Sequence, residues 1–268
     1  MAGMYRLIWL QHVHKSAGST IVNQAIANGE VPYGNHKNGN PYTDEGELLH
    51  LWDFNDEQLG NFVDKCEEEG VTFVATEWGA PNYETLERDP RVILITCLRE
   101  PYSRLVSNFN YDYYFGFSKS TTIEEYISEA GTLKMDNFLV RVYSRKYQNN
   151  SDELDDKSLE IALTNLRRFD LVLAIENQND LSEHLFEALG WKKKQVDSHR
   201  TFGNFRILLS LVVRLRFFKA WNYFARSIIG DTEFTKSRFI QHSRLDTEFY
   251  NRILQESIRG NLHPLQKF

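Results

Sequence analysis

Two apolar runs, each followed by a polar loop and a helical pattern, constrain the fold of this chain most strongly. The run 5–13 precedes the loop 14–20 (HKSAGST), and the run 92–98 precedes Arg99 and a helical pattern that opens at Pro101. A helix N-terminus offers free backbone N–H groups and the positive end of the helix dipole, which favour anions. With Lys15 in one loop and Arg99 in the other, the pattern predicts a ligand that carries phosphate at two places.

Four short apolar runs have the composition of buried parallel strands. They are rich in Val, Ile, Leu and Phe and lie at 6–13, 71–76, 92–98 and 171–175. Parallel strands covered on both faces show such nearly continuous hydrophobicity. Helical patterns lie between them, at 59–70, from 101 onwards, and at 136–147, 158–169 and 178–189. This alternation predicts an α/β fold in a single domain, with a mostly parallel sheet flanked by helices and a site at the carboxyl ends of the strands.

The composition excludes several classes of protein. The 268 residues suffice for one large domain, and a net charge of −6 argues against a general nucleic-acid binder. Cys66 and Cys97 are the only cysteines, and both fall on apolar faces, so we expect two buried thiols. The sequence has no clustered His or Cys pattern, so we expect no metal site. Neither a signal peptide nor a transmembrane segment is evident.

Two further segments are unusual in composition. Residues 29–46 are rich in Gly, Asn, Pro and Tyr, which predicts a long surface loop that closes over the site. The segment 203–230 mixes large apolar residues with arginine and lysine. It is interpreted either as one long amphipathic helix, packed on the domain or pairing two subunits, or as an element that contacts a membrane surface or an acceptor. The oligomeric state is not predicted.

The first loop lacks the G-x-x-x-x-G-K-[ST] pattern of nucleotide kinases. Lys15 would place a point charge on an oxygen of the ligand, and Ala17 and Gly18 would let an anion approach the backbone closely. Arg99 and Ser107 lie about two helical turns apart and could grip a terminal phosphate. Taken singly, the first loop is equally consistent with a structural loop that carries a solvated lysine. In the second loop, Arg99 would otherwise cap the sheet edge and Ser107 would lie on a helix surface.

Taken together, these residues resemble the two cofactor-binding motifs of sulfotransferases that use 3′-phosphoadenosine-5′-phosphosulfate. The closest resemblance is to carbohydrate sulfotransferases of the heparan sulfate 2-O type. It rests on the loop 14–20 and on 98–107 with its aromatic tail 113–115, and it extends over residues 6 to 256. The other matching pieces are Asp136-Asn137-Phe138 with Arg141, 171–176, Gly190-Trp191, Leu245-Asp246 and Phe249-Tyr250. The resemblance implies a P-loop-like sulfotransferase fold.

The resemblance also implies roles for residues of the loops. Lys15 would contact the bridging oxygen of the donor and stabilise the departing nucleotide. Arg99 and Ser107 would hold the 3′-phosphate, and Arg200 either closes over the same phosphate or is an ordinary exposed charge. The 5′-phosphate would lie in a cradle formed by Ser16, Ala17, Gly18, Ser19 and Thr20.

The catalytic base is less closely matched. Glu77 follows the strand 71–76 at a point near which the 2-O-type relatives have a histidine. In an apolar pocket beside Trp78, its carboxyl would have a raised pKa suited to accepting a proton. His50 is the alternative base, and His12 and His14 are expected to support the shape of the loop.

The sequence therefore predicts a sulfotransferase that moves a sulfuryl group from 3′-phosphoadenosine-5′-phosphosulfate to an acceptor hydroxyl, without a metal. The acceptor would be a carbohydrate, a lipid headgroup or a small alcohol. The alternatives are a P-loop-like small-molecule kinase and a non-catalytic nucleotide-binding module. We expect a cytoplasmic location, or the Golgi lumen if an N-terminal anchor has been removed.

Overall fold

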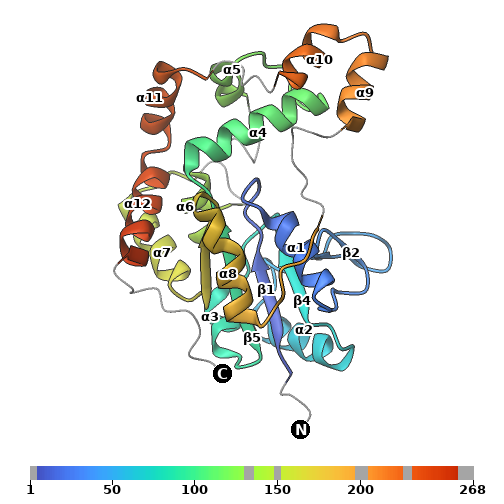
Figure 1. Cartoon of the computed structure of the whole chain (residues 1–268). Helices are drawn as coiled ribbons and strands as arrows, with labels where there is room; N and C mark the ends of the chain where they lie inside the picture. Colours follow the sequence, from blue (N-terminus) through green and yellow to red (C-terminus); the bar gives the residue numbers. More distant parts are fainter. Residues whose placement is uncertain (1–4, 130–135, 148–151, 197–204, 226–230, 259–268) are drawn as a thin grey trace.

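A sheet of four parallel strands, in the order β4–β1–β5–β6, forms the centre of the computed structural model (Figure 1). The structure describes residues 5–129, 136–147, 152–196, 205–225 and 231–258. The strands are β1 Leu7–Gln11, β4 Phe73–Thr76, β5 Val92–Leu98 and β6 Leu171–Ala174. They fall within the four predicted runs, so the α/β class and the parallel sheet are confirmed.

Helices cover both faces of the sheet because successive side chains of a buried strand point to opposite sides. Ile8 and Leu10 pack in one cluster with the helices α1 Gly18–Ala27 and α8 Gln178–Leu189. Leu7 and Trp9 pack in the cluster on the other face. The helices of that face are α2 Asp56–Glu68, α3 Tyr83–Arg88, α6 Phe138–Tyr143, α7 Asp156–Leu166 and α12 Arg244–Ile258.

The helix α2 follows directly from its sequence. Asn55 and Gln58 form a capping box, in which each side chain accepts from the backbone N–H of the other. The buried face includes Cys66, and Gly70, with φ of 70°, follows the end of the helix in the left-handed conformation that favours glycine. Cys66 and Cys97 are both free and buried, as predicted.

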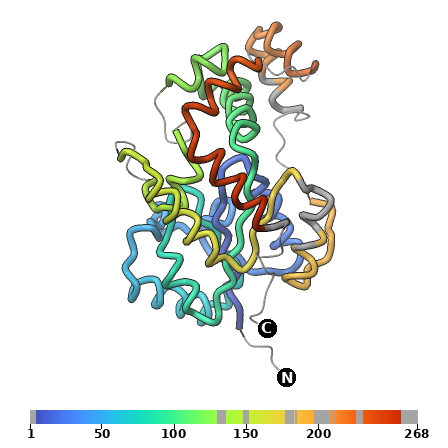
Figure 2. The backbone as a smooth tube through the Cα atoms, turned by 90° about the vertical axis from the view of Figure 1, so that its left-hand side faces the viewer, coloured from blue at the N-terminus to red at the C-terminus, as the bar shows by residue number. Residues whose placement is uncertain are grey.

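A second group of helices lies beyond the carboxyl edge of the sheet (Figures 1 and 2). Its axis is α4 Pro101–Phe115, which begins just after β5 and so connects the group to the sheet. The other members are α5 Ile123–Ser128, α9 Phe205–Val213, α10 Phe217–Phe224 and α11 Glu233–His242. They share a separate apolar cluster with α4. None of the helices in the described ranges is long and apolar enough to cross a membrane.

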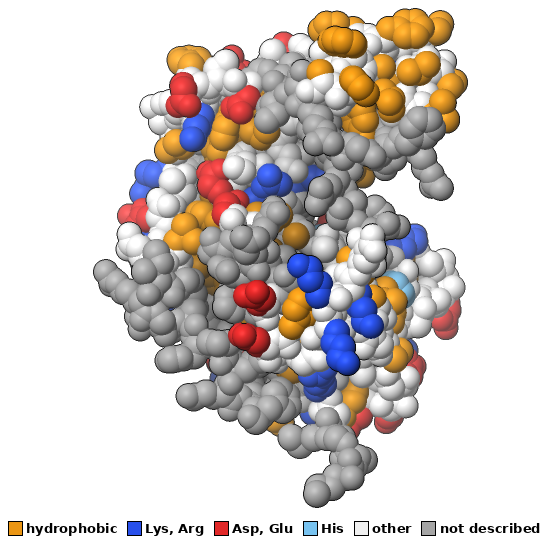
Figure 3. Space-filling model, viewed as in Figure 1, with side chains coloured by type: hydrophobic (Ala, Val, Ile, Leu, Met, Phe, Trp, Pro, Cys, Tyr) orange, Lys and Arg blue, Asp and Glu red, His pale blue; other side chains and the backbone are white. Residues whose placement is uncertain are grey.

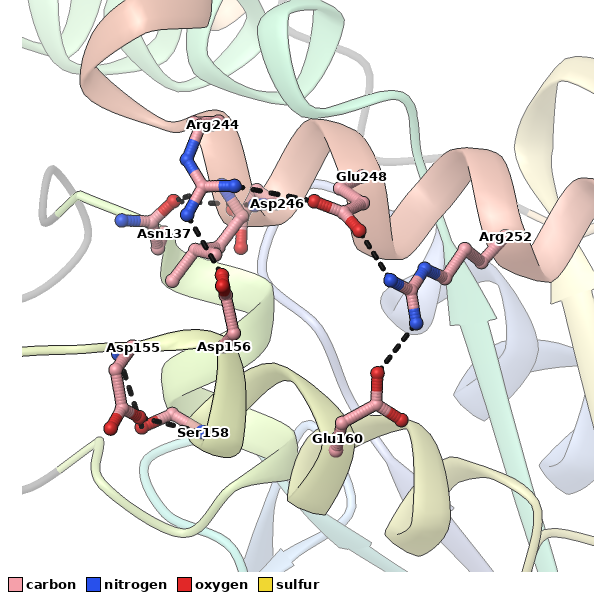
Figure 4. A network of polar contacts seen from close by, with 10 residues as sticks. Asn137, Asp155, Asp156, Ser158, Glu160, Arg244, Asp246, Glu248 and Arg252 are labelled. Atoms are coloured by element: carbon pink, nitrogen blue, oxygen red, sulfur yellow. Dashed lines mark hydrogen bonds and ion pairs between the residues drawn. The ribbon is translucent and has the colours of Figure 1, made fainter.

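The N-termini of α6 and α12 cap each other (Figure 4). The side-chain carbonyl of Asn137 accepts from the N–H groups of Leu245, at 2.9 Å, and Asp246, at 3.2 Å. The Asp246 carboxylate in turn accepts from the N–H groups of Leu139 and Val140, at 3.0 and 2.9 Å. Burial raises the pKa of Asp246 to about 6. Ion pairs from Arg244 to Asp156 and from Arg252 to Glu160 then attach α12 to α7.

The prediction of one long helix within 203–230 is wrong. The helices α9 and α10 are separated at Leu215, whose φ is 56°. The N–H of Leu215 donates to Val212 and that of Arg216 donates to Leu211, which is the hydrogen-bond pattern of a Schellman motif. Because leucine occupies the left-handed position that glycine usually takes, the sequence carries no sign of this helix end.

The segment 29–46 is also more ordered than the predicted loop. It contains the paired strands β2 His36–Lys37 and β3 Asn40–Pro41, which run antiparallel. Asn40 is buried, and the backbone N–H of Ala75 in β4 donates to the carbonyl of Gly39. The segment is therefore attached to the edge of the sheet rather than lying loose on the surface.

Candidate functional site

The polar loops after β1 and β5 lie side by side at the carboxyl edge of the sheet. The two strands pair in parallel register, with Gln11 beside Thr96. The two loops therefore leave the sheet at the same level. Nη1 of Arg99 donates to the main-chain carbonyl of Lys15 over 3.4 Å. The structure thus places both loops where the sequence predicts them.

The first loop leaves the N-terminus of α1 open. Lys15 and Ala17 have φ of 66° and 63°, and the Ser16 N–H donates to the carbonyl of Val13. Ala17 occupies the N-cap position without a side chain that could cap the helix. Within the described ranges, the N–H groups of Gly18 and Ser19 at the start of α1 have no acceptor. These donors are the ones that a bound anion would use.

Packing against His12 also requires glycine at position 18. A Cβ atom at this position would lie 1.7 Å from Cδ2 of His12. His12 itself is buried, with 4% of its surface exposed. The imidazole of His12, which packs against the first turn of α1, therefore leaves room only for glycine at this position.

The second loop differs from the first, because the N-terminus of α4 is already occupied. The Glu100 carboxylate accepts from the N–H groups of Tyr102 and Ser103, at 3.0 and 2.7 Å. A carboxylate in this position satisfies the free donors and the helix dipole. The expectation of two open helix ends is therefore wrong, and the Arg99 side chain is the group of this loop that could pair with an anion.

Three buried polar atoms around the two loops have no hydrogen-bond partner in the described part of the chain. They are Oγ of Ser16, Nε of Arg99 and Nε2 of His14. Buried polar groups in proteins are nearly always paired, and leaving one unpaired costs about 1–3 kcal/mol. They lie on both sides of the contact between Lys15 and Arg99, where a polar ligand could supply the missing partners.

Lys15 is mostly buried beside a second cation. Burial, and then the charge of Arg99, lower the pKa of its ammonium group to about 8, although Asp112 and Glu77 oppose this change. Its Nζ atom lies 4.2 Å from the centre of the Tyr111 ring, within the range of a cation–π contact. An anion that binds here would relieve the repulsion between the two cations.

Glu77 lies at the end of β4 between two histidines. Its Oε1 is 2.9 Å from Nδ1 of His14, and its Oε2 is 3.6 Å from Nδ1 of His12. Burial raises the pKa of the carboxyl, but His12, His14 and a hydrogen bond from Asn38 outweigh burial and lower it below the usual value. The predicted raised pKa is therefore wrong, because the sequence does not reveal the two histidine partners.

The Glu77 carboxylate also determines which ring nitrogen of His14 carries the hydrogen of their bond. Since a carboxylate only accepts, Nδ1 of His14 carries the hydrogen of their bond. In the neutral imidazole, Nε2 then has a free lone pair, and this is one of the buried atoms without a partner. The pair has the geometry of a base and the carboxylate that orients it.

The remaining predicted residues are distributed more widely. Oγ of Ser19 accepts from Asn38 over 3.1 Å, and Thr20 follows it in the first turn of α1. Ser107 is half-buried on α4. The His50 side chain is 60% exposed, and its Nδ1 lies 3.5 Å from Oδ2 of Asp53. Its ring stacks on that of Trp52. Arg200 lies outside the described residues.

Sequence reasoning missed several residues that shape this site. The role of His14 depends on a contact with Glu77, which lies 63 positions away. Tyr111 contacts Lys15 from α4, and Asn38 reaches Ser19 and His12 from the hairpin. The aromatic tail of the second motif was the one signal that could have pointed to Tyr111.

No protein-family model and no curated protein matches the chain. The chain is thus an α/β protein that brings the cationic side chains of Lys15 and Arg99 together at the carboxyl edge of its parallel sheet.

Proposed function

We propose that this chain is a sulfotransferase with a P-loop-like sulfotransferase fold, which transfers a sulfuryl group from 3′-phosphoadenosine-5′-phosphosulfate to an acceptor hydroxyl. The observation that carries the proposal is the set of unpartnered buried atoms in the two loops, on Ser16, Arg99 and His14. They accompany Lys15 and Arg99, whose contact brings two cationic side chains to one edge of the sheet. The phosphates of the donor nucleotide would accept from Ser16 and Arg99, and the hydroxyl of the acceptor would donate to Nε2 of His14.

The donor would lie across the contact between the loops. The open N-terminus of α1 and the Ser16 hydroxyl would hold the 5′-phosphate. The Arg99 guanidinium, with Ser107 further along α4, would hold the 3′-phosphate. Lys15 would lie near the oxygen that bridges phosphorus and sulfur, where negative charge develops as the bond breaks.

The proposed transfer needs one proton acceptor. The acceptor oxygen attacks sulfur, the bond from sulfur to the bridging oxygen breaks, and the electron pair stays on the nucleotide phosphate beside Lys15. The hydroxyl proton passes to Nε2 of His14, whose Nδ1–H remains bonded to Glu77. This assigns the base to His14 and makes Glu77 the residue that orients it, in place of the direct role predicted for Glu77.

Binding measurements test the donor assignment. Calorimetry without Mg²⁺ should show that 3′-phosphoadenosine-5′-phosphate binds much more tightly than AMP. Arg99→Gln should weaken the doubly phosphorylated ligand by about 10- to 150-fold and leave AMP binding nearly unchanged, since a charge-assisted contact is worth about 1.5–3 kcal/mol. Arg88→Gln on α3, where Arg88 is 69% exposed, is the matched control. Equal affinity for both ligands would refute the proposal.

Turnover measurements test the assignment of the base. With labelled donor and a panel of saccharide, lipid and alcohol acceptors, His14→Asn should lower turnover by about 10²–10⁴-fold while donor binding is retained. An active His14→Asn with an inactive Glu77→Gln would return the base to Glu77. An active His14→Asn with an inactive His50→Ala would move it to His50.

A further inference from the structure

The outer surface of α9 and α10 carries a group of apolar side chains that the proposed reaction does not use. We call this group the apolar patch. It appears at the upper right of Figure 3, and its six members are between 62% and 74% exposed. They are Val213, Leu215, Phe217, Phe218, Trp221 and Phe224. Single exposed apolar residues are ordinary, but a contiguous group of this kind marks an interaction surface.

The part of the patch on α10 lies on the side of that helix that faces away from α4. On the inward side of α10, Ala220 and Tyr223 are buried, and the Tyr223 ring packs edge-on against Tyr114 of α4, with 5.2 Å between centroids. Nζ of Lys219 donates to the carbonyl of Tyr113 and lies 3.6 Å from the centre of its ring. These contacts fix α10 on α4, so its exposed apolar face is available to a partner.

The charge of the segment that carries the patch indicates which kind of partner binds there. The segment 203–230 contains five basic residues and no Asp or Glu, in a chain whose net charge is −6. Arg214 and Arg216 are exposed between the apolar members of the patch. A second copy of the chain would bring these arginines together with no carboxylate from either segment to neutralise them. An anionic bilayer surface instead offers phosphate to the arginines and acyl chains to the apolar side chains, with Trp221 suited to the boundary.

The patch is also continuous with the candidate site. The Arg216 guanidinium lies close to Gly116, where a Cβ atom would be 3.6 Å from its Nη1. On either side of Gly116, Phe115 stacks on Phe117, and Phe115 also packs against Tyr111 with 4.4 Å between ring centroids. Tyr111 in turn holds Lys15. A row of aromatic rings thus runs from beside Arg216 to the loop after β1.

We propose that the apolar patch, with Arg214 and Arg216, docks this protein on the surface of a membrane that contains anionic lipid. The apolar side chains enter the headgroup region without crossing the bilayer, and the arginines contact lipid phosphates. The proposal does not depend on the identity of the reaction.

Vesicle flotation with the full chain tests this proposal. Phosphatidylcholine vesicles with about 30 mol% phosphatidylserine should carry the protein, and pure phosphatidylcholine vesicles should not. Binding should weaken as salt is raised, because salt screens the arginines. The double variant Arg214→Gln/Arg216→Gln should lose about 25-fold in partition, or about fivefold per charge.

Apolar variants separate membrane docking from simple charge attraction. Phe218→Glu and Trp221→Glu should each lower partition by about 10-fold or more. Ile161→Glu on α7, which also replaces an exposed apolar side chain, should bind like the parent protein. All three should keep the parent thermal transition, which shows that they fold.

Three outcomes would overturn the proposal. They are failure to bind anionic vesicles, binding that Phe218→Glu leaves unchanged, and sedimentation of a dimer that Phe218→Glu dissociates. The last would assign the patch to a second copy of the chain. Because the vesicle assay contains no nucleotide, a failure here is distinct from a failure of the proposed reaction.

Discussion

Replacing Lys15 by methionine should stabilise the empty protein at neutral pH. The surroundings of Lys15 lower its pKa from the usual 10.5 to about 8, which is a difference of roughly 2.5 units. At about 1.36 kcal/mol per unit, the charged ammonium costs the folded state about 3 kcal/mol. Methionine has a similar length and no charge, and the unusual φ of 66° at this position applies to both residues.

The sign of the pH dependence follows from proton binding. Between pH 8 and 10.5 the unfolded chain holds the lysine proton and the folded chain has lost it, so the stability of the parent protein rises with pH in this window. Below pH 8 the lysine is charged in both states, so the folded state carries the full cost of the buried ammonium group. The advantage of Lys15→Met should therefore be greatest at pH 7, decline above pH 8 and vanish near pH 10.5.

Urea unfolding of both proteins at several pH values between 7 and 10.5 measures this difference. Lys157→Met, at an exposed position on α7, is the control and should stay within about 0.5 kcal/mol of the parent. If the stability profiles of Lys15→Met and the parent run parallel across this range, Lys15 is not destabilised by burial and by Arg99. In that case the account of a cation held ready for an anion would be refuted.

Three further substitutions test local packing at the site and at two helix ends. Gly18→Ala should lower the free energy of unfolding by about 1–3 kcal/mol, because its Cβ would overlap His12. Adding His12→Ala should restore part of the loss, and strictly additive effects of the two substitutions in calorimetry would contradict the contact. Asp246→Ala should lower the free energy of unfolding in urea by about 2–5 kcal/mol, since it leaves the buried N–H groups of Leu139 and Val140 without acceptors. A loss of stability no larger than that of Glu248→Ala would argue against this cap. Leu215→Gly should raise the unfolding midpoint by an amount equivalent to about 1 kcal/mol, because glycine adopts the left-handed conformation without strain. A lower midpoint would show that the leucine side chain contributes more to stability than the backbone strain costs.

Local patterns in the sequence determined much of the architecture. Runs such as 92–98 are apolar throughout because their strands are covered on both faces, and this signal needs no knowledge of the neighbours. Pro101 and Gly70 similarly mark a helix start and a helix end through their own backbone preferences. These features, and the carboxyl-edge position of the two loops, could be predicted because each depends on residues close together in the chain.

The tertiary structure decided the state of each polar group in the site. Whether a helix end is free or capped depends on side-chain conformation, and Glu100 occupies the second end while no side chain caps the first. The pKa of Glu77 reflects His12 and His14, which lie more than 60 positions away in the chain and adjoin it only because β1 pairs with β4. Hydrogen bonds and charges act over a few ångströms of space whatever the separation in sequence, so the fold had to be known before they could be read.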